Sequence, residues 1–193
     1  MRRQITRMTV AAVAVGWLLL ATMSGQEKPK PEQYSAIWAT VGGVADGTNA
    51  PVEIRINRYN TDADIQKFSD FLKAKGADAL RDALEREDLG YVSSPKRTRV
   101  PIALARKLTE GKTTIIRVVV ARDLWLNEFR FSGRSSEYPF MIVQLDIDAN
   151  GKGTGNAIAA AKIVFNKKAD TYEVKSYEKE TGINKLLNVQ VVK

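Results

Sequence analysis

The sequence predicts an α+β domain, in which an antiparallel β-sandwich or barrel of about seven to eight strands carries one helical insertion at about residues 62–87. Apolar and polar residues alternate along much of the chain after residue 51, with the period of strands that have one buried face. Apolar residues at helical spacing are confined to residues 61–86. Parallel winding would need a helix between successive strands, so the sequence favours antiparallel pairing.

Two predicted strands precede the helical insertion. Residues 34–44 form the first apolar run, which ends at a Gly-Gly pair. Val52, Ile54 and Ile56 then alternate with polar residues, which predicts a strand with one face in a core.

Local signals define the insertion most clearly. Thr61 is a good helix N-cap with Asp64 three residues later, and apolar residues from Ile65 to Leu72 follow at steps of three and four. Lysines occupy the last turn before Gly76. A second amphipathic segment at 78–86 completes either a helical hairpin or one kinked helix.

The rest of the chain is predicted to be mainly β. Residues 100–110 and 113–121 form a hairpin, and residues 141–147 form a strand that enters an Asn150-Gly151 turn. Residues 158–165 predict a strand, with helix as an alternative because of their alanines. A turn at 166–170 and strands at 171–177 and 186–192 follow.

The N-terminus has the pattern of a Sec-type signal peptide. Three arginines precede an apolar run at 8–21, and small polar residues then place a cleavage site near Ser24-Gly25. We therefore expect residues 1–25 to be a signal peptide, 26–33 a linker and 34–193 a single domain. The apolar run is shorter than a membrane span, so the mature chain is expected to be secreted or periplasmic, with no stable membrane span.

Composition excludes several classes of function. The 193 residues contain no histidine and no cysteine, which removes Ser-His-Asp and Cys-His catalysis and His- or Cys-ligated metals, and we expect no cofactor or metal. The formal net charge is +8, and the predicted signal carries three of the arginines. The remaining Lys and Arg residues are scattered, apart from a short cluster at 96–99, so nucleic acid is not an expected partner.

Three short motifs have structural interpretations. Asp146-x-Asp148-x-Asn150-Gly151 matches the start of an EF-hand loop, but its twelfth position is Ala157, so we interpret it as a strand entering a turn. The GxGxG run at 151–155 lacks a dinucleotide fingerprint and is interpreted as turns. Residues 93–96 fit the S-x-x-K pattern of acyl-transfer enzymes, without that family's companion motifs.

The segment from residue 122 to 140 is the strongest candidate for a ligand-binding loop. It combines aromatic faces with arginines, which offer forked donors for carboxylate, phosphate or sulfate. The candidate ligand-binding residues are Arg122, Trp125, Arg130, Arg134 and Tyr138. The alternative is that these aromatics cover the end of the sheet.

The same segment also contains Asp123, Glu128 and Glu137, which could include the carboxylate pair of a glycosidase. No catalytic residue is assigned from the sequence, because sequence does not give the separation of these acids.

The order of motifs also carries a resemblance. An Arg-Asp pair at 122–123 follows a β-branched strand, RSSEYPF follows at 134–140, and a strand ends in a D-x-D-x-N-G-K-G turn at 146–153. Over most of the mature chain this order resembles a group of secreted bacterial proteins to which no activity is assigned. The resemblance implies export and a single domain, and it transfers no catalytic residue.

The sequence thus favours an exported, non-enzymatic binding or structural domain for a small apolar or anionic ligand. One alternative is a carboxylate-dependent hydrolase acting on saccharide. Another is an envelope interaction or scaffold protein, whose exposed sheet edge pairs with a strand of a partner protein.

Overall fold

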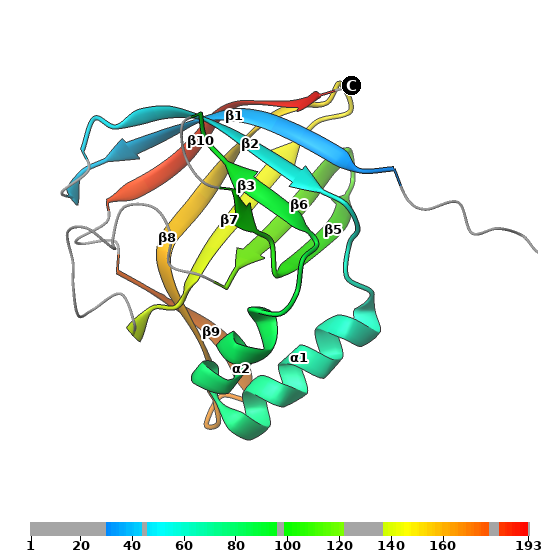
Figure 1. Cartoon of the computed structure of the whole chain (residues 1–193), viewed down its shortest axis with the longest axis vertical. Helices are drawn as coiled ribbons and strands as arrows, with labels where there is room; N and C mark the ends of the chain where they lie inside the picture. Colours follow the sequence, from blue (N-terminus) through cyan, green and yellow to red (C-terminus); the bar gives the residue numbers. More distant parts are fainter. Residues whose placement is uncertain (1–29, 44–45, 96–98, 122–136, 178–181, 193) are drawn as a thin grey trace, which may run out of the picture.

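The computed structural model describes residues 30–43, 46–95, 99–121, 137–177 and 182–192. Most of this part is antiparallel β-structure, with two short helices (Figure 1). The predicted signal peptide lies outside the described residues. The strands are β1 (Glu32–Val41), β2 (Asn49–Ile56), β3 (Gly90–Ser93), β4 (Val100–Pro101), β5 (Leu104–Glu110), β6 (Thr113–Val120), β7 (Phe140–Ile147), β8 (Lys152–Asn166), β9 (Thr171–Ser176) and β10 (Ile183–Val192).

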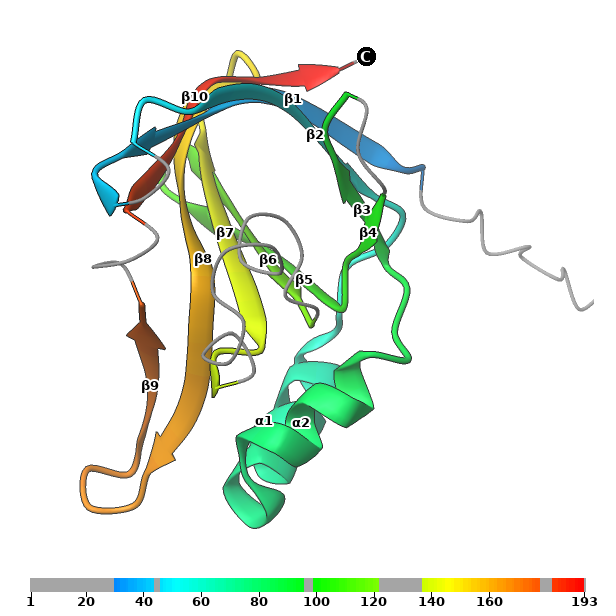
Figure 2. The same ribbon diagram turned by 60° about the vertical axis from the view of Figure 1, so that its left-hand side comes forward.

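The strands form one strongly curled sheet in the order β4-β3-β2-β1-β10-β8-β7-β6-β5, with β9 paired to β8 (Figure 2). β4 and β5, the first and last strands of this order, are consecutive in the chain. Ile102 and Ala103 join them. The Ile102 amide donates to the Gly90 carbonyl, and the Ala103 amide donates to the Val119 carbonyl, each at 2.9 Å. The segment therefore bonds first to β3 and then to β6.

The described part of the chain contains ten strands, which corrects the predicted number of seven or eight. Residues 100–110 form a single predicted strand, but the structure divides them into β4 and β5 where the pairing partner changes. β1 begins at Glu32, within the last two residues of the range 26–33 that is predicted as a linker.

The concave face of the sheet encloses the main core. Tyr34 and Trp38 of β1 face inward, together with Ile116 and Val118 of β6 and Leu145 of β7, and all five are buried. Alternation along each strand places these side chains on one face, as the sequence pattern predicts.

Gly153 and Gly155 lie inside β8 and not in turns, which corrects the interpretation of the GxGxG run. A Cβ at Gly153 would lie 1.9 Å from the Asp146 carbonyl oxygen, and one at Gly155 would lie 2.4 Å from the Gln144 carbonyl oxygen. These glycines therefore allow β7 and β8 to approach closely. Gly151, with φ of 75°, is in the turn, where the Asp148 carboxylate accepts bonds from the Asn150 and Lys152 amides at 2.8 and 2.9 Å.

The insertion forms two helices, α1 (Asp62–Lys75) and α2 (Ala77–Leu84), separated by Gly76 at φ 86°. Thr61 and Asp64 form the predicted capping box at the start of α1. A second buried cluster joins the two helices to the outer face of the sheet. It includes Phe68, Leu72, Leu80 and Leu84 of the helices and Val119, Phe140 and Ala161 of the sheet. No helix in the described ranges is long and apolar enough to cross a membrane.

β8 extends beyond β7, which settles the strand-or-helix alternative for residues 158–165 in favour of a strand. Pairing with β7 ends at Ala161, and residues 162–166 pair only with β9. The β8–β9 hairpin therefore projects past the rest of the sheet, beside the helices (Figure 2). The turn predicted at 166–170 closes this hairpin, and the Asn166 side chain accepts bonds from the Lys168 and Ala169 amides.

Candidate functional site

Most of the sequence-predicted ligand-binding residues lie outside the described part of the chain. This applies to Arg122, Trp125, Arg130 and Arg134, so that site stays a prediction. Tyr138 is described: it is half-buried, and its ring lies 5.3 Å from the Tyr177 ring between centroids. An aromatic residue of this segment therefore packs against the residue that directly follows β9.

The described structure contains a different candidate site, a hollow of about 410 Å³ between the helices and the end of β8. It lies where the junction of α1 and α2 faces the stretch of β8 that β7 does not cover. We call it the lysine hollow. Its lining is Leu72, Lys73, Ala74, Lys75, Gly76, Ala77, Asp78, Lys162, Val164, Phe165 and Lys167.

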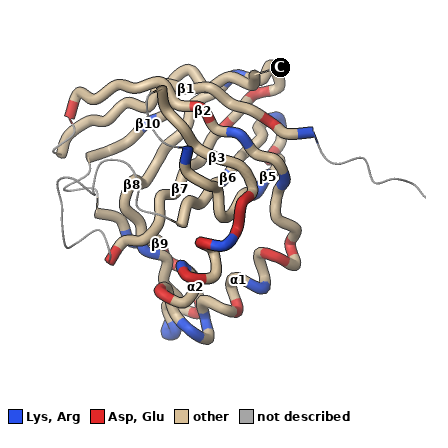
Figure 3. Tube along the Cα trace, in the orientation of Figure 1, with Lys and Arg blue, Asp and Glu red and all other residues tan. Residues whose placement is uncertain are grey.

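Four lysines from two separate parts of the chain meet in the lysine hollow. Lys73 and Lys75 belong to the last turn of α1, where cations suit the negative end of the helix dipole. Lys162 lies on β8, and Lys167 lies in the turn that follows. One acid, Asp78, also lines the hollow. Figure 3 shows basic positions, with some acidic ones, at this lower end of the molecule.

Aromatic contacts hold two of the four ammonium groups. Lys73 Nζ lies 4.5 Å from the centroid of Phe165, and Lys75 Nζ lies 4.6 Å from that of Phe71. Such contacts orient a lysine without neutralising its charge.

Among the described residues, one of the four lysines forms an ion pair. Lys73 pairs with Asp170 at 3.0 Å, and this hydrogen bond raises the pKa of Lys73. Within the described residues, Lys75, Lys162 and Lys167 form no ion pair. The hollow therefore combines excess positive charge with apolar wall residues, among them the buried Leu72.

A second hollow, of about 420 Å³, lies over β1, β2 and β3. Its charged groups are engaged: Tyr91 donates to Glu53 at 2.6 Å, and the Arg99 guanidinium lies 4.4 Å from the Tyr91 ring centroid. Ser93 and Ser94 also line it, but the lysine of their S-x-x-K pattern lies outside the described residues. This hollow offers less uncompensated charge than the lysine hollow.

A cluster of titratable groups surrounds Glu32 at the start of β1. Its carboxylate accepts hydrogen bonds from Tyr34, from Tyr59 at 2.7 Å and from Lys107 at 2.7 Å. Burial acts to raise the pKa of Glu32, but the hydrogen bonds from Lys107 and the two tyrosines outweigh it, and the pKa is lowered. A carboxyl group that acts as a general acid near neutral pH needs a raised pKa, so this cluster fits a structural role.

The acids proposed for a hydrolase are not brought together by the described structure. Asp123 and Glu128 lie outside it, and Glu137 is exposed. The carboxyl groups whose pKa is perturbed, Glu32, Asp64 and Asp148, all have lowered values. Among the described residues, no group of three acidic side chains could hold a metal ion.

Sequence reasoning missed the lysine hollow because its two pairs of lysines are separated by more than eighty positions. The local signals were the two lysines in the last turn before Gly76 and Lys167 in the predicted turn, and nothing in the sequence connects them. Comparison with protein families, curated proteins and solved structures finds no match to this chain.

Proposed function

We propose that the protein is an exported, non-catalytic binding protein whose lysine hollow takes a small anionic molecule. The observation that carries this proposal is the gathering of four lysines against one aspartate around a partly apolar hollow. Three of these lysines have no acidic partner in the described structure, so an anion in the hollow would supply the missing counter-charge.

The arrangement favours binding through charge more than through a fixed donor geometry. A lysine ammonium is a compact point charge, whereas arginine presents a planar fork that selects carboxylate or phosphate by shape. The hollow is therefore expected to accept carboxylate, sulfate and phosphate groups alike. Contacts with Phe71 and Phe165 keep two ammonium groups near the hollow before a ligand arrives, which lowers the entropy cost of binding.

The wall of the hollow indicates the rest of the ligand. Val164 and Phe165 on β8, which are partly exposed, give it apolar surface beside the charges. At about 410 Å³, the hollow lies in the size range of small-molecule sites. We therefore infer an amphipathic ligand, with one anionic head and a short aromatic or aliphatic body.

Binding is favoured over turnover by the chemistry available near the hollow. The chain has no histidine or cysteine, and Asp78 is the single carboxylate in the lining. A single carboxylate without a second acid in the lining does not provide the acid–base pair that hydrolysis by carboxylates uses.

Calorimetric titration of the mature chain tests the proposal. The probes are phenyl phosphate, benzoate and inorganic phosphate, with phenol as the neutral control. We expect phenyl phosphate and benzoate to bind, phosphate to bind more weakly and phenol to give no heat. Binding should also weaken as salt is added, because the attraction is between exposed charges.

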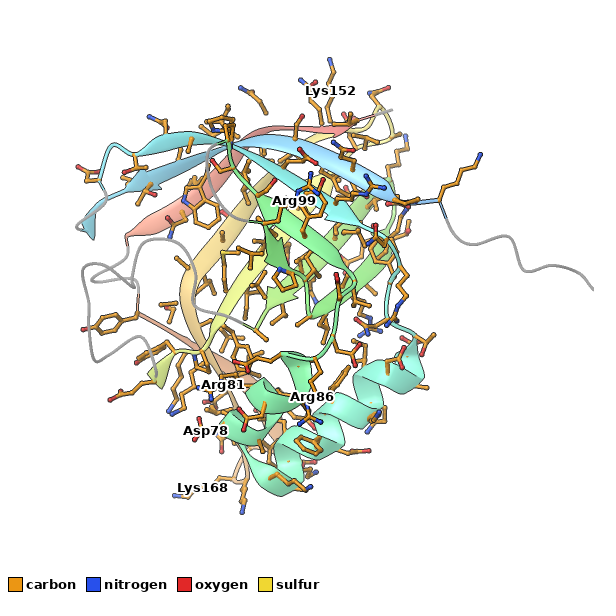
Figure 4. The ribbon with its side chains drawn as sticks, in the orientation of Figure 1. Asp78, Arg81, Arg86, Arg99, Lys152 and Lys168 are labelled. Atoms are coloured by element: carbon orange, nitrogen blue, oxygen red, sulfur yellow. The ribbon has the colours of Figure 1, made fainter. Side chains whose placement is uncertain are left out.

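Charge reversal in the hollow tests which residues bind the probe, and charge reversal elsewhere on β8 provides the matched control. The double variant Lys162→Glu/Lys167→Glu should lose about tenfold or more in affinity for phenyl phosphate, since two attractive charges become repulsive. Lys152→Glu is the control, because Lys152 lies at the opposite end of β8 from the hollow (Figure 4). Equal loss in both variants, or no binding of either anionic aromatic probe, would overturn the proposal.

A further inference from the structure

β9 is an edge strand of the described sheet. It pairs with β8 on one side, and no described strand pairs with its other side. Figure 2 shows β9 at the margin of the molecule, with its outer edge facing away from the sheet. An edge of this kind is a template for pairing with another strand.

The backbone groups that face this edge follow from the register with β8. The Tyr177 amide donates to the Ala160 carbonyl at 3.1 Å, so Tyr177 and every second residue before it direct their backbone groups toward β8. The intervening residues, Tyr172, Val174 and Ser176, direct their N–H and C=O groups toward the outer edge.

Side chains along β9 leave this edge accessible. Tyr172 and Val174 are 46% and 50% exposed, which makes them two of the most exposed large apolar residues in the described chain. Glu173 and Lys175 alternate with them on the other face of the strand. Pairing with a further strand would therefore cover apolar surface on one face and bring charges together on the other.

We propose that two copies of this chain associate through their β9 strands, antiparallel, with Val174 opposite Val174 of the partner subunit. In this register Glu173 lies opposite Lys175 of the partner subunit, and twofold symmetry repeats the pair. The outward-facing backbone groups also meet, because Tyr172 lies opposite Ser176 of the partner subunit. Each such pair exchanges two backbone hydrogen bonds.

Charge excludes the neighbouring registers. Two other registers preserve the backbone hydrogen bonds, each reached by sliding the partner strand two residues. One of them places Glu173 opposite Glu173 of the partner subunit. The other places Lys175 opposite Lys175 of the partner subunit. Like charges directly opposite each other destabilise a strand pair, and opposite charges stabilise it. The sequence of β9 is thus complementary to itself in one register, which favours a second copy over an unrelated strand.

The monomer also leaves Lys175 without a counter-charge. Its cross-strand neighbour on β8 is Lys162, and within the described structure it has no acidic partner. Glu173 of the partner subunit would lie beside Lys175 at a non-hydrogen-bonded position, where side chains approach most closely. The proposed pairing therefore supplies Lys175 with a counter-charge that it does not have within the described monomer.

Because β9 has six residues, the interface is short and the dimer is expected to be weak. Sedimentation velocity of the mature chain over a wide concentration range should show a reversible monomer–dimer equilibrium. A chain that remains monomeric throughout that range would overturn the proposal.

A charge swap tests the register. Glu173→Lys and Lys175→Glu should each weaken dimerisation about tenfold or more, because each places like charges opposite one another in both symmetry-related pairs. The double variant Glu173→Lys/Lys175→Glu restores opposite charges and should dimerise like the original chain. Circular dichroism checks that each variant folds, since Glu173 also accepts a bond from Asn166 at 2.6 Å. Failure of the double variant to recover dimerisation would contradict the register.

Cross-linking provides an independent measurement. The chain has no cysteine, so Val174→Cys introduces a single thiol at the twofold axis. Opposed residues at a hydrogen-bonded position lie about 5.5 Å apart between Cα atoms, which a disulfide can span. At concentrations where sedimentation shows dimer, mild oxidation should cross-link this variant rapidly, and Lys152→Cys, at the other end of β8, should remain monomeric. Equal cross-linking of the two variants would indicate random collision and overturn the proposal.

Discussion

At the scale of single residues, Glu32 shows how one carboxylate joins distant parts of the chain. Its bonds from Tyr34 on β1, Tyr59 after β2 and Lys107 on β5 connect the start of the sheet to its far side. Burial and the bonds to Glu32 also raise the pKa of both tyrosines, so their hydroxyls stay protonated as donors. The cluster therefore fixes the start of β1 against β5 and the segment after β2.

This cluster predicts how stability depends on pH. Because the folded pKa of Glu32 is below its ordinary value of 4.5, its contribution to the free energy of unfolding is present above 4.5 and is lost as pH falls through the folded value. The pKa values of Tyr34 and Tyr59 are raised in the folded state. Their contribution to the free energy of unfolding is therefore present below 10.0 and is lost as pH rises above it.

Replacement of Glu32 tests this account. Glu32→Ala should cost about 1.5–3 kcal/mol at neutral pH, since it leaves partly buried donors unpaired, and it should flatten the decline in stability at acid pH. Urea denaturation between acid and neutral pH provides the measurement. The exposed Glu110→Ala is the control and should change little. An unchanged pH profile in Glu32→Ala would contradict the assignment.

At the scale of elements, the contact between β7 and β8 depends on small residues. Gly153 and Gly155 leave no room for a Cβ, and Ala157 and Ala161 pair with β7 farther along β8. Local propensity favours helix for such alanines, but pairing on both sides requires a strand.

This close approach predicts a strong effect of one methyl group. Gly153→Ala would place its Cβ against the backbone of Asp146, where no flexible side chain can move away. We expect it to lower the free energy of unfolding by about 1–3 kcal/mol, the usual cost of overpacking. Gly47→Ala is the matched control, because its Cβ would meet open space and only its φ of 74° is unfavourable. Thermal denaturation of both variants should rank Gly153→Ala as the more damaging, and the reverse ranking would contradict the close contact.

At the scale of the whole molecule, the curled sheet and the helices create surfaces that no single element has. The lysine hollow forms where α1 and α2 meet the projecting end of β8, and the free edge of β9 lies on the same hairpin. The lysine hollow and the edge of β9 are therefore neighbours. Lys162 lines the hollow, and its cross-strand partner is Lys175 on β9.

Export is a prediction for the whole chain. Expressed in a bacterial host with its own N-terminus, the protein should be recovered outside the cytoplasm, with a new N-terminus near Ser24-Gly25. Cell fractionation followed by intact-mass measurement checks this. Replacing Arg2, Arg3 and Arg7 with glutamate should retain the chain in the cytoplasm, because the positive n-region is removed. Recovery of the uncleaved chain in the cytoplasm without these changes would contradict the prediction.

The sequence by itself determined the elements whose signals are local. The capping box at Thr61 and the alternation of Val52, Ile54 and Ile56 predicted α1 and β2, because caps and periodicity act within a few residues. Only the tertiary structure decided that residues 100–110 divide into β4 and β5, that β8 is a strand throughout and that four lysines share one hollow. Each of these outcomes depends on residues far apart along the chain, whose proximity is set by strand pairing and core packing and leaves no local signature.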